Sequence, residues 1–181
     1  MKYMVDVAMG MHHISVKGLI HRVKASSPYL QPSMIMRNLY IFQDLAARNI
    51  LVGVHETCKI SGFGLLRELP KDDSIYISQS DMPCPVRWMA PESIEEREFS
   101  TASDVWSFGI LQWEMFNPSK IPYPDMDNVQ CALNVSQGYT LPIPRGCSSI
   151  MAKIMRSCWS QDPAKRPSFF LIATTLSRAT I

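Results

Sequence analysis

Residues 44 to 49 read Asp-Leu-Ala-Ala-Arg-Asn, and this hexapeptide decides how the rest of the chain is interpreted. Taken alone, it also fits a helix that begins with an N-cap Asp followed by helix-forming residues. The residues after it include two short runs rich in β-forming side chains, 49–52 and 57–60, separated by Gly53 to Glu56. Two such runs joined by a turn predict a small β-hairpin directly after the hexapeptide.

Helical patterns lie on both sides of this segment. Residues 1 to 22 carry apolar side chains at three- and four-residue steps, which predicts an amphipathic helix ending near Gly18. The residues of this stripe are Met4, Val7, Ala8, Met11 and Ile14. Four further helices are expected over 103–117, 128–137, 148–159 and 168–178. The tryptophans expected in or near the core are Trp106, Trp113 and Trp159.

Composition limits the classes of function. The chain has 181 residues, of which 46% are hydrophobic, and this length is enough to bury one sizeable core. Its 18 basic and 16 acidic residues leave a net charge of only +2, so nucleic acid is not an expected partner. No apolar run approaches the roughly 18 residues of a membrane-spanning helix, and no signal-peptide layout is present. We therefore expect a cytoplasmic chain, or the cytoplasmic part of a receptor.

The five cysteines are scattered and lack metal-ligand spacing. Their odd number suits a reducing compartment better than a disulfide framework, so we interpret them as core thiols. They are Cys58, Cys84, Cys131, Cys147 and Cys158.

Four motifs follow one another in the order typical of one enzyme family. After residues 44–49 come residues 85–92 (Pro-Val-Arg-Trp-Met-Ala-Pro-Glu), residues 104–109 (Asp-Val-Trp-Ser-Phe-Gly) and residues 158–167, which end in Lys-Arg-Pro. Together they resemble the C-terminal lobe of a protein tyrosine kinase domain, over residues 1 to 22 and 44 to 181. The resemblance implies a mainly α kinase C-lobe with one small β-hairpin and an activation segment from Gly62 to Glu92.

The resemblance also assigns roles to the hexapeptide. Asp44 would accept the proton of the substrate hydroxyl, Arg48 would belong to the same catalytic set, and Asn49 would bind Mg²⁺. Serine/threonine kinases usually place a Lys two positions after this Asp. Ala46 stands there instead, which implies tyrosine as the acceptor and protein tyrosine substrates or other kinases as partners.

Other residues would build the surroundings of this loop. Pro85, Val86 and Trp88 would form a platform for the aromatic ring of the substrate. Glu92 would form a bidentate ion pair with Arg166, a structural contact suited to guanidinium geometry. Asp104 would accept backbone N–H bonds from the residues just before Asp44.

The chain departs from the family pattern at the metal site. The resemblance predicts Asp-Phe-Gly after the hairpin, and the chain has Gly62-Phe63-Gly64. Gly62 offers no carboxylate to a hard divalent cation. The chain also begins after the family's N-terminal lobe, which would hold the glycine-rich loop, the strand lysine and the adenine hinge. We therefore expect weak or absent binding of ATP and Mg²⁺ at what remains of the cleft, with Leu51 as its apolar floor.

A second departure lies before the hexapeptide. His21-Arg22 follows Gly-Leu-Ile as in the family, yet deleting residues 23–43 is needed to restore His-Arg-Asp-Leu-Ala-Ala-Arg-Asn. The ends of this stretch can be encoded as intron borders, so we interpret 23–43 as an insert of the retained-intron type. We expect it to be conformationally independent, because a packed lobe has no cavity for it and its prolines oppose a long helix. Its two basic residues account for the net charge.

The insert leaves two candidates for the segment that Asp104 would hold. One is the family-like His21-Arg22, and the other is Phe42-Gln43, which directly precedes Asp44. We favour His21-Arg22 with the insert looped out, because the preceding helix delivers those residues to the site.

Tyr76 is the single tyrosine of the activation segment and follows two aspartates. It is the candidate phosphorylation site, where the new charge would act near Arg22 or Arg48. The alternative is an ordinary exposed loop tyrosine.

Three functional hypotheses follow. The first is a kinase-family protein without catalysis, a binding module or scaffold in signal transduction, because Gly62 disables metal binding. The second is a truncated or misassembled form of an active tyrosine kinase that transfers the ATP γ-phosphate to protein tyrosine, with Gly62 a single-nucleotide change from Asp. The third is a non-coding remnant that never folds.

Overall fold

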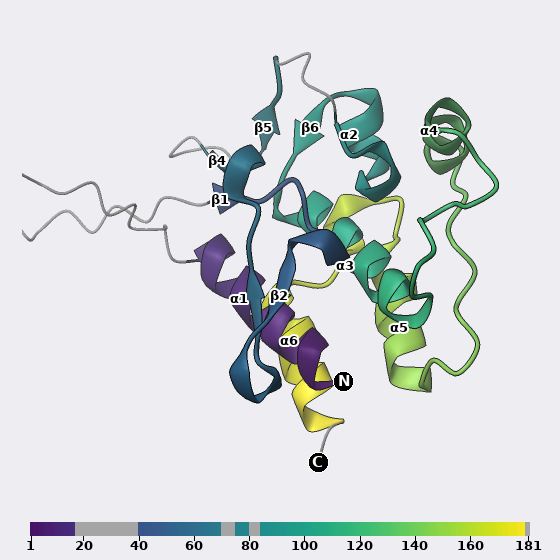
Figure 1. The fold of residues 1–181 in the computed structure, drawn as a ribbon. Coiled ribbons are helices and arrows are strands. Elements are labelled where there is room, and N and C mark those ends of the chain that lie inside the picture. Colours follow the sequence, from purple (N-terminus) through teal and green to yellow (C-terminus); the bar gives the residue numbers. More distant parts are fainter. Residues whose placement is uncertain (17–39, 70–74, 80–83, 180–181) are drawn as a thin grey trace, which may run out of the picture.

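The structure is a computed structural model that describes residues 1–16, 40–69, 75–79 and 84–179 (Figure 1). Helices dominate the described ranges, and none of them is long and apolar enough to span a membrane. The α-helices are α1 (Lys2–Val16), α2 (Pro91–Glu95), α3 (Thr101–Phe116), α4 (Asn128–Ser136), α5 (Ser149–Cys158) and α6 (Phe169–Arg178). This architecture agrees with the expected mainly α fold.

The strands described here form three two-stranded antiparallel sheets. They pair β2 (Ile50–Val52) with β3 (Cys58–Ile60), β1 (Tyr40–Ile41) with β4 (Arg67–Glu68), and β5 (Tyr76–Ile77) with β6 (Glu98–Phe99). The first pair is the predicted hairpin. The other two were not predicted, because strands of two residues are too short to show a period-2 pattern.

Helix α3 is the centre of the lobe. It begins at Ser100, whose side chain accepts hydrogen bonds from the backbone N–H groups of Ala102 and Ser103 in a capping box. Its residues from Ser103 to Trp113 are buried, and α5 packs against it. Helix α1 packs along α6 and contacts β3, while α4 packs against α2 (Figure 1).

The predicted helical patterns are confirmed. The five stripe residues of the first helix are the buried ones of α1, and the three tryptophans expected in the core are buried. The interpretation of the cysteines holds for Cys131 and Cys158, which are buried. It is wrong for Cys84, which is exposed within the activation segment.

Residues 40 to 43, the end of the stretch interpreted as an insert, are packed in the lobe. Tyr40 and Ile41 pair with Glu68 and Arg67, and both Ile41 and Phe42 are fully buried. The expectation of conformational independence is therefore wrong for these residues, while the interpretation of 23–43 as a retained-intron insert stays a prediction. Residues 23–39 and His21-Arg22 lie outside the described residues.

Candidate functional site

The hexapeptide gathers its three polar residues around one carboxylate. Asp44 lies between β1 and the 3₁₀ turn Ala47–Asn49, with its side chain 19% exposed. One carboxylate oxygen forms an ion pair with Arg48. The Asn49 amide nitrogen Nδ2 donates to the other carboxylate oxygen and to the Asp44 carbonyl, both at 2.7 Å. The structure therefore brings together the residues expected to be catalytic.

Trp88 and Glu114 connect this loop to the expected platform. The Arg48 guanidinium lies over the Trp88 ring, 4.4 Å from its centroid. A single oxygen of Glu114, Oε2, accepts hydrogen bonds from Trp88 Nε1 and from the backbone N–H of Ala47, each at 2.9 Å. Burial raises the pKa of the Glu114 carboxyl, although these two bonds oppose the shift. Sequence reasoning missed Glu114, whose only signal was an acidic residue near the end of a mostly apolar helix.

Arg87 fixes the other edge of the platform, the 3₁₀ turn Val86–Trp88. Its guanidinium donates to the carbonyls of Pro122 and Tyr123, both at 2.8 Å, and to that of Met126 at 2.6 Å. Its Nε donates to Asn128 Oδ1 at 3.0 Å. Arg87 thus ties the turn to the start of α4, a role that sequence reasoning missed.

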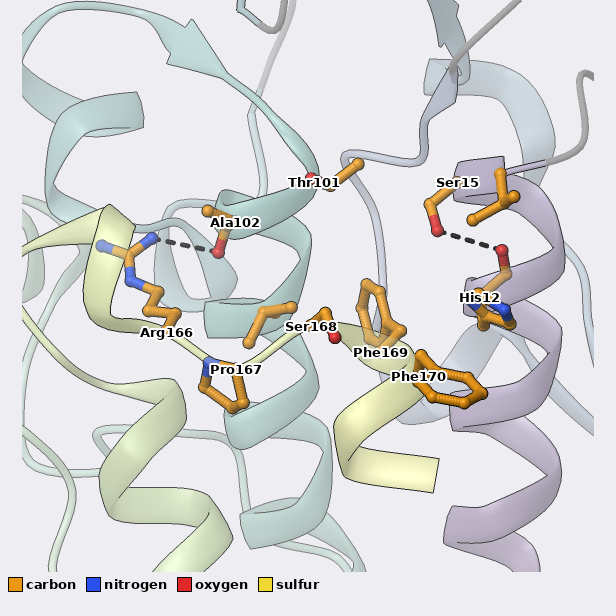
Figure 2. A pocket seen from close by; sticks show the side chains of 11 residues that line it. His12, Ser15, Thr101, Ala102, Arg166, Pro167, Ser168, Phe169 and Phe170 are labelled. Carbon is orange, nitrogen blue, oxygen red and sulfur yellow. Dashed lines mark hydrogen bonds between the residues drawn. The ribbon is translucent and has the colours of Figure 1, made fainter. Parts of the chain in front are cut away.

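The predicted pair of Glu92 and Arg166 is confirmed. The two guanidinium nitrogens donate to the two carboxylate oxygens at 2.6 and 2.8 Å, and the Arg166 side chain is completely buried. Arg166 also donates to the carbonyl of Ser160 and to that of Ala102 (Figure 2). The guanidinium lies 5.1 Å from the centroid of the Trp106 ring. This contact anchors the end of the activation segment to the helical core.

Asp104 holds the segment before Asp44, but not through the residues we favoured. Its carboxylate accepts the backbone N–H of Phe42 at 2.8 Å and that of Gln43 at 2.9 Å. The expectation that His21-Arg22 fills this place is therefore wrong. Phe42 and Gln43 directly precede Asp44 and offer the same kind of backbone donor, so the chain next to the catalytic loop fills this place itself.

Gln43 adopts a left-handed backbone with φ 65°, which is uncommon for a residue with a side chain. Its position is imposed by its bond to Asp104. Burial raises the pKa of Asp104 to about 7, although the bonds from Phe42 and Gln43 oppose the shift.

Gly62 occupies the position where the family resemblance places a metal-binding carboxylate. Gly62 is in the left-handed region with φ 80°, and a Cβ placed there would meet the Asn49 amide, 2.9 Å from Nδ2 and closer still to Oδ1. The Phe63 ring makes an edge contact with Phe42, with centroids 5.5 Å apart, and nothing lies within 4 Å of a Cβ at Gly64. Leu51, the expected cleft floor, is 57% exposed on β2.

The residues around Gly62 do not fit Mg²⁺. A hard cation of this size needs oxygen ligands and is usually held by one or two carboxylates. Gly62 supplies none, the Asp44 carboxylate is already bonded to Arg48 and Asn49, and the Asn49 amide donates toward it. Within the described ranges, no group of three or more His, Cys, Asp or Glu residues could hold a metal ion.

Tyr76 does not lie in an open loop. It belongs to β5, is half-buried and pairs with Phe99 of β6. It packs against the small cluster formed by Ile41, Leu69, Met89 and Phe99. Its phosphorylation stays a prediction, and it would require β5 to leave this pairing.

The chain is similar to known protein kinases. Residues 33–176 match the family model described as protein tyrosine and serine/threonine kinase. The chain is 46% identical over 141 residues to "Protein-tyrosine kinase 6" of Homo sapiens, a match that covers 78% of this chain and 31% of that protein. It is 39% identical over 165 residues to "Ephrin type-A receptor 3" of Danio rerio, covering 91% and 16%. The chain therefore spans less than a third of the length of these curated relatives.

The family match begins at residue 33, inside the stretch interpreted as an insert. The match thus includes residues 40–43, which are packed in the lobe. The match also covers the loop around Asp44, the platform and the Glu92–Arg166 pair. The chain belongs to the protein tyrosine and serine/threonine kinase family, among its tyrosine kinases.

Proposed function

We propose that this chain is a tyrosine-kinase-family lobe that binds polypeptide segments in cytoplasmic signalling and does not itself transfer phosphate. The proposed binding surface, called the platform surface below, consists of Asp44, Arg48, Pro85, Val86 and Trp88. The observation that carries the proposal is Gly62, which stands where the family's metal-binding carboxylate belongs.

The loss of that carboxylate affects the largest contribution to phosphoryl transfer. Catalysis of this reaction rests mainly on positioning and on neutralising charge around the transferred group, and metal ions supply much of that neutralisation. Asp44 can still act as a base, but general-base catalysis contributes only about 10²- to 10⁴-fold. Enzymes typically accelerate reactions by about 10⁶-fold or more, so the base alone leaves most of the barrier in place.

The residues of the platform surface keep their supporting contacts. Trp88 Nε1 donates a hydrogen bond to Glu114, and the Arg48 guanidinium lies over the Trp88 ring. Arg87 fixes the same turn to the start of α4. An aromatic ring flanked by a guanidinium suits an aromatic side chain of a bound segment. The platform surface therefore supports recognition of a tyrosine-containing segment even without chemistry.

A transfer assay tests the absence of catalysis. The chain is incubated with ATP, Mg²⁺ and a tyrosine peptide, and phosphopeptide is measured by mass spectrometry beside the variant Asp44→Asn. We expect both chains to give the same background. Metal-dependent transfer that Asp44→Asn abolishes would overturn the proposal.

Binding of the same tyrosine peptide tests whether the platform surface recognises polypeptide segments. We expect Trp88→Ala to weaken it by about tenfold, the loss of one aromatic anchor, while Trp88→Phe keeps most of it. Equal binding by the wild-type chain and Trp88→Ala would remove the platform surface from the proposal.

The retained geometry around Asp44 supports a second candidate, a form of an active tyrosine kinase that has lost one carboxylate. Asp tolerates the left-handed conformation of Gly62 better than most residues. We therefore expect Gly62→Asp to gain Mg²⁺-dependent nucleotide binding that the wild-type chain lacks, measured by isothermal titration calorimetry. If Gly62→Asp binds Mg²⁺ and ATP no more tightly than the wild-type chain, the lost carboxylate is not what limits binding and the second candidate fails.

A further inference from the structure

A groove runs between α5 and α6, away from every residue of the platform surface. It has a volume of about 520 Å³ and is lined from Ile150 to Ser157 on one helix and from Ser168 to Thr175 on the other. At 1.5 Å per residue, each wall is about 10 Å long, or two helical turns. The groove is thus long enough to seat two turns of a third helix.

The groove has an apolar floor and an open apolar wall. Ile154 and Ile172 are buried at its base, and Leu171 at its rim is 55% exposed. The groove exists because α6 packs chiefly on α1, and α5 chiefly on α3, which leaves facing sides of α5 and α6 uncovered. The loop through Pro167 separates it from a second hollow on the α1 side of α6, where Phe170 lies against His12 (Figure 2).

The charge of the groove has one sign. Lys153 and Lys165 line it, and among the residues that the structure describes no Asp or Glu does. Arg166 also lines it, but Glu92 neutralises that guanidinium. Asp162 lies 3.3 Å from Lys165 in an exposed pair, which contributes little and leaves Lys165 available.

The surrounding sequence has the same bias. Residues 148–181 contain five basic residues and one acidic residue, whereas residues 1–147 contain 13 basic and 15 acidic residues. The small net charge of the whole chain therefore conceals a positive end. A positive surface around an apolar groove attracts a negatively charged partner and fixes its orientation.

We propose that the α5–α6 groove binds an acidic amphipathic helix of a partner protein. Apolar side chains at positions i and i+4 of that helix would enter the groove beside Leu171, in the manner of helix-in-groove recognition. Carboxylates flanking them would meet Lys153 and Lys165. This site is separate from the platform surface and does not depend on the function proposed for it.

The apolar contact and the charge contact of the proposed interaction can each be tested with a variant and a control. Leu171→Asp places a charge in the groove, and Leu133→Asp places one at a leucine of α4 that is 58% exposed and outside it. The double variant Lys153→Glu/Lys165→Glu reverses the groove charge. Lys120→Glu makes the same change at an exposed lysine elsewhere. All five side chains changed here are exposed, and a melting curve checks that each variant is folded.

The probe is a fluorescein-labelled, helix-stapled peptide of 14 residues with Leu at positions 5 and 9 and Glu at the flanking positions. Its counterpart carries Lys at every Glu position. Binding to the full chain is measured by fluorescence anisotropy. We expect the acidic peptide to bind at least about tenfold more tightly than the basic one, and Leu171→Asp and the double lysine variant each to weaken it by about tenfold or more. Leu133→Asp and Lys120→Glu should change it less than about twofold.

Other outcomes overturn the proposal. No binding of the acidic peptide, or equal loss in the control variants, means that the groove is not a helix site. Binding to phosphatidylserine vesicles that the lysine variant abolishes, without peptide binding, assigns the surface to a membrane. Concentration-dependent self-association in sedimentation that Leu171→Asp abolishes, again without peptide binding, assigns it to a second copy of the chain.

Discussion

The two sides of Asp44 differ in how their structure is maintained. On the platform side, Trp88 is bonded to Glu114 and stacked under Arg48, and Arg87 donates to three carbonyls. On the metal side, the expected ligand position is a glycine, and the Asn49 amide bonds to Asp44 instead.

The two sides also differ in how many groups support them. Trp88 and its turn contact Glu114 of α3, Arg48 and the carbonyls of the loop before α4, so a single substitution leaves other contacts in place. On the metal side, Gly62 supplies no carboxylate, and the described residues contain no group of three or more His, Cys, Asp or Glu residues that could hold a metal ion. Under the proposed function, a change at this one position is enough to remove metal-dependent chemistry while the platform surface keeps its contacts.

The largest effect is expected at the anchor of the platform side. Arg166→Ala leaves Glu92 without its partner in a largely buried site and should lower the free energy of unfolding by about 3 kcal/mol. Lys165→Ala, which breaks only an exposed pair, should change it by less than about 1 kcal/mol. Chemical denaturation measures both, and equal values for the two variants would contradict the buried-anchor interpretation.

A smaller loss of stability is expected when Glu114, which bonds to both the platform and the catalytic loop, is replaced. Glu114→Leu leaves the N–H groups of Trp88 and Ala47 without an acceptor and should cost about 2 kcal/mol. Glu114→Gln keeps a carbonyl oxygen and should cost about half as much. The comparison is made in urea, and a larger loss for Gln than for Leu would show that the hydrogen bonds are not what Glu114 contributes.

On the metal side, Gly62→Ala tests whether Asn49 fills the vacant position. Any Cβ at a left-handed glycine is strained, and Gly146, with φ 81° and no neighbour within 4 Å, is the control. We expect Gly62→Ala to be about 1 kcal/mol more destabilising than Gly146→Ala, because it also displaces Asn49 from Asp44. Thermal unfolding measures the difference, and equal losses would mean that the Asn49 bonds add no stability.

The smallest effect on stability is expected at Asp104, which binds the segment Phe42–Gln43 just before Asp44. Because burial raises the pKa of Asp104 to about 7, the folded chain keeps a proton that the unfolded chain has released, between about pH 4 and pH 7. Stability from this group is therefore present below that window and lost as the pH rises through it, by about 0.7 kcal/mol per pH unit near pH 7. Unfolding of wild type and Asp104→Asn is compared at pH 6.5 and 7.5. A variant with the same pH slope would contradict the assignment.

Much of this fold was predictable from the sequence because its helices are amphipathic and its motifs are ordered. The stripe of α1 and the Glu92–Arg166 pair follow from spacing and from the family pattern. Glu114 and Arg87 could not be found in this way, because their partners are distant in sequence and are brought to them by packing, several of them backbone groups. The same holds for the choice between His21-Arg22 and Phe42-Gln43, since a backbone N–H carries no side-chain signature.

Asp104 binds main chain rather than side chains, and this separates two kinds of selection on the residues before Asp44. The anchor needs only two backbone N–H groups, so it places no requirement on the side chains of Phe42 and Gln43. Phe42 is nevertheless fully buried in the core, so selection for folding still acts on its side chain through packing. Gln43 is constrained through its left-handed backbone, which few residues with a side chain adopt. The anchor can therefore be inherited unchanged while the residues that supply it are selected for packing and for backbone conformation.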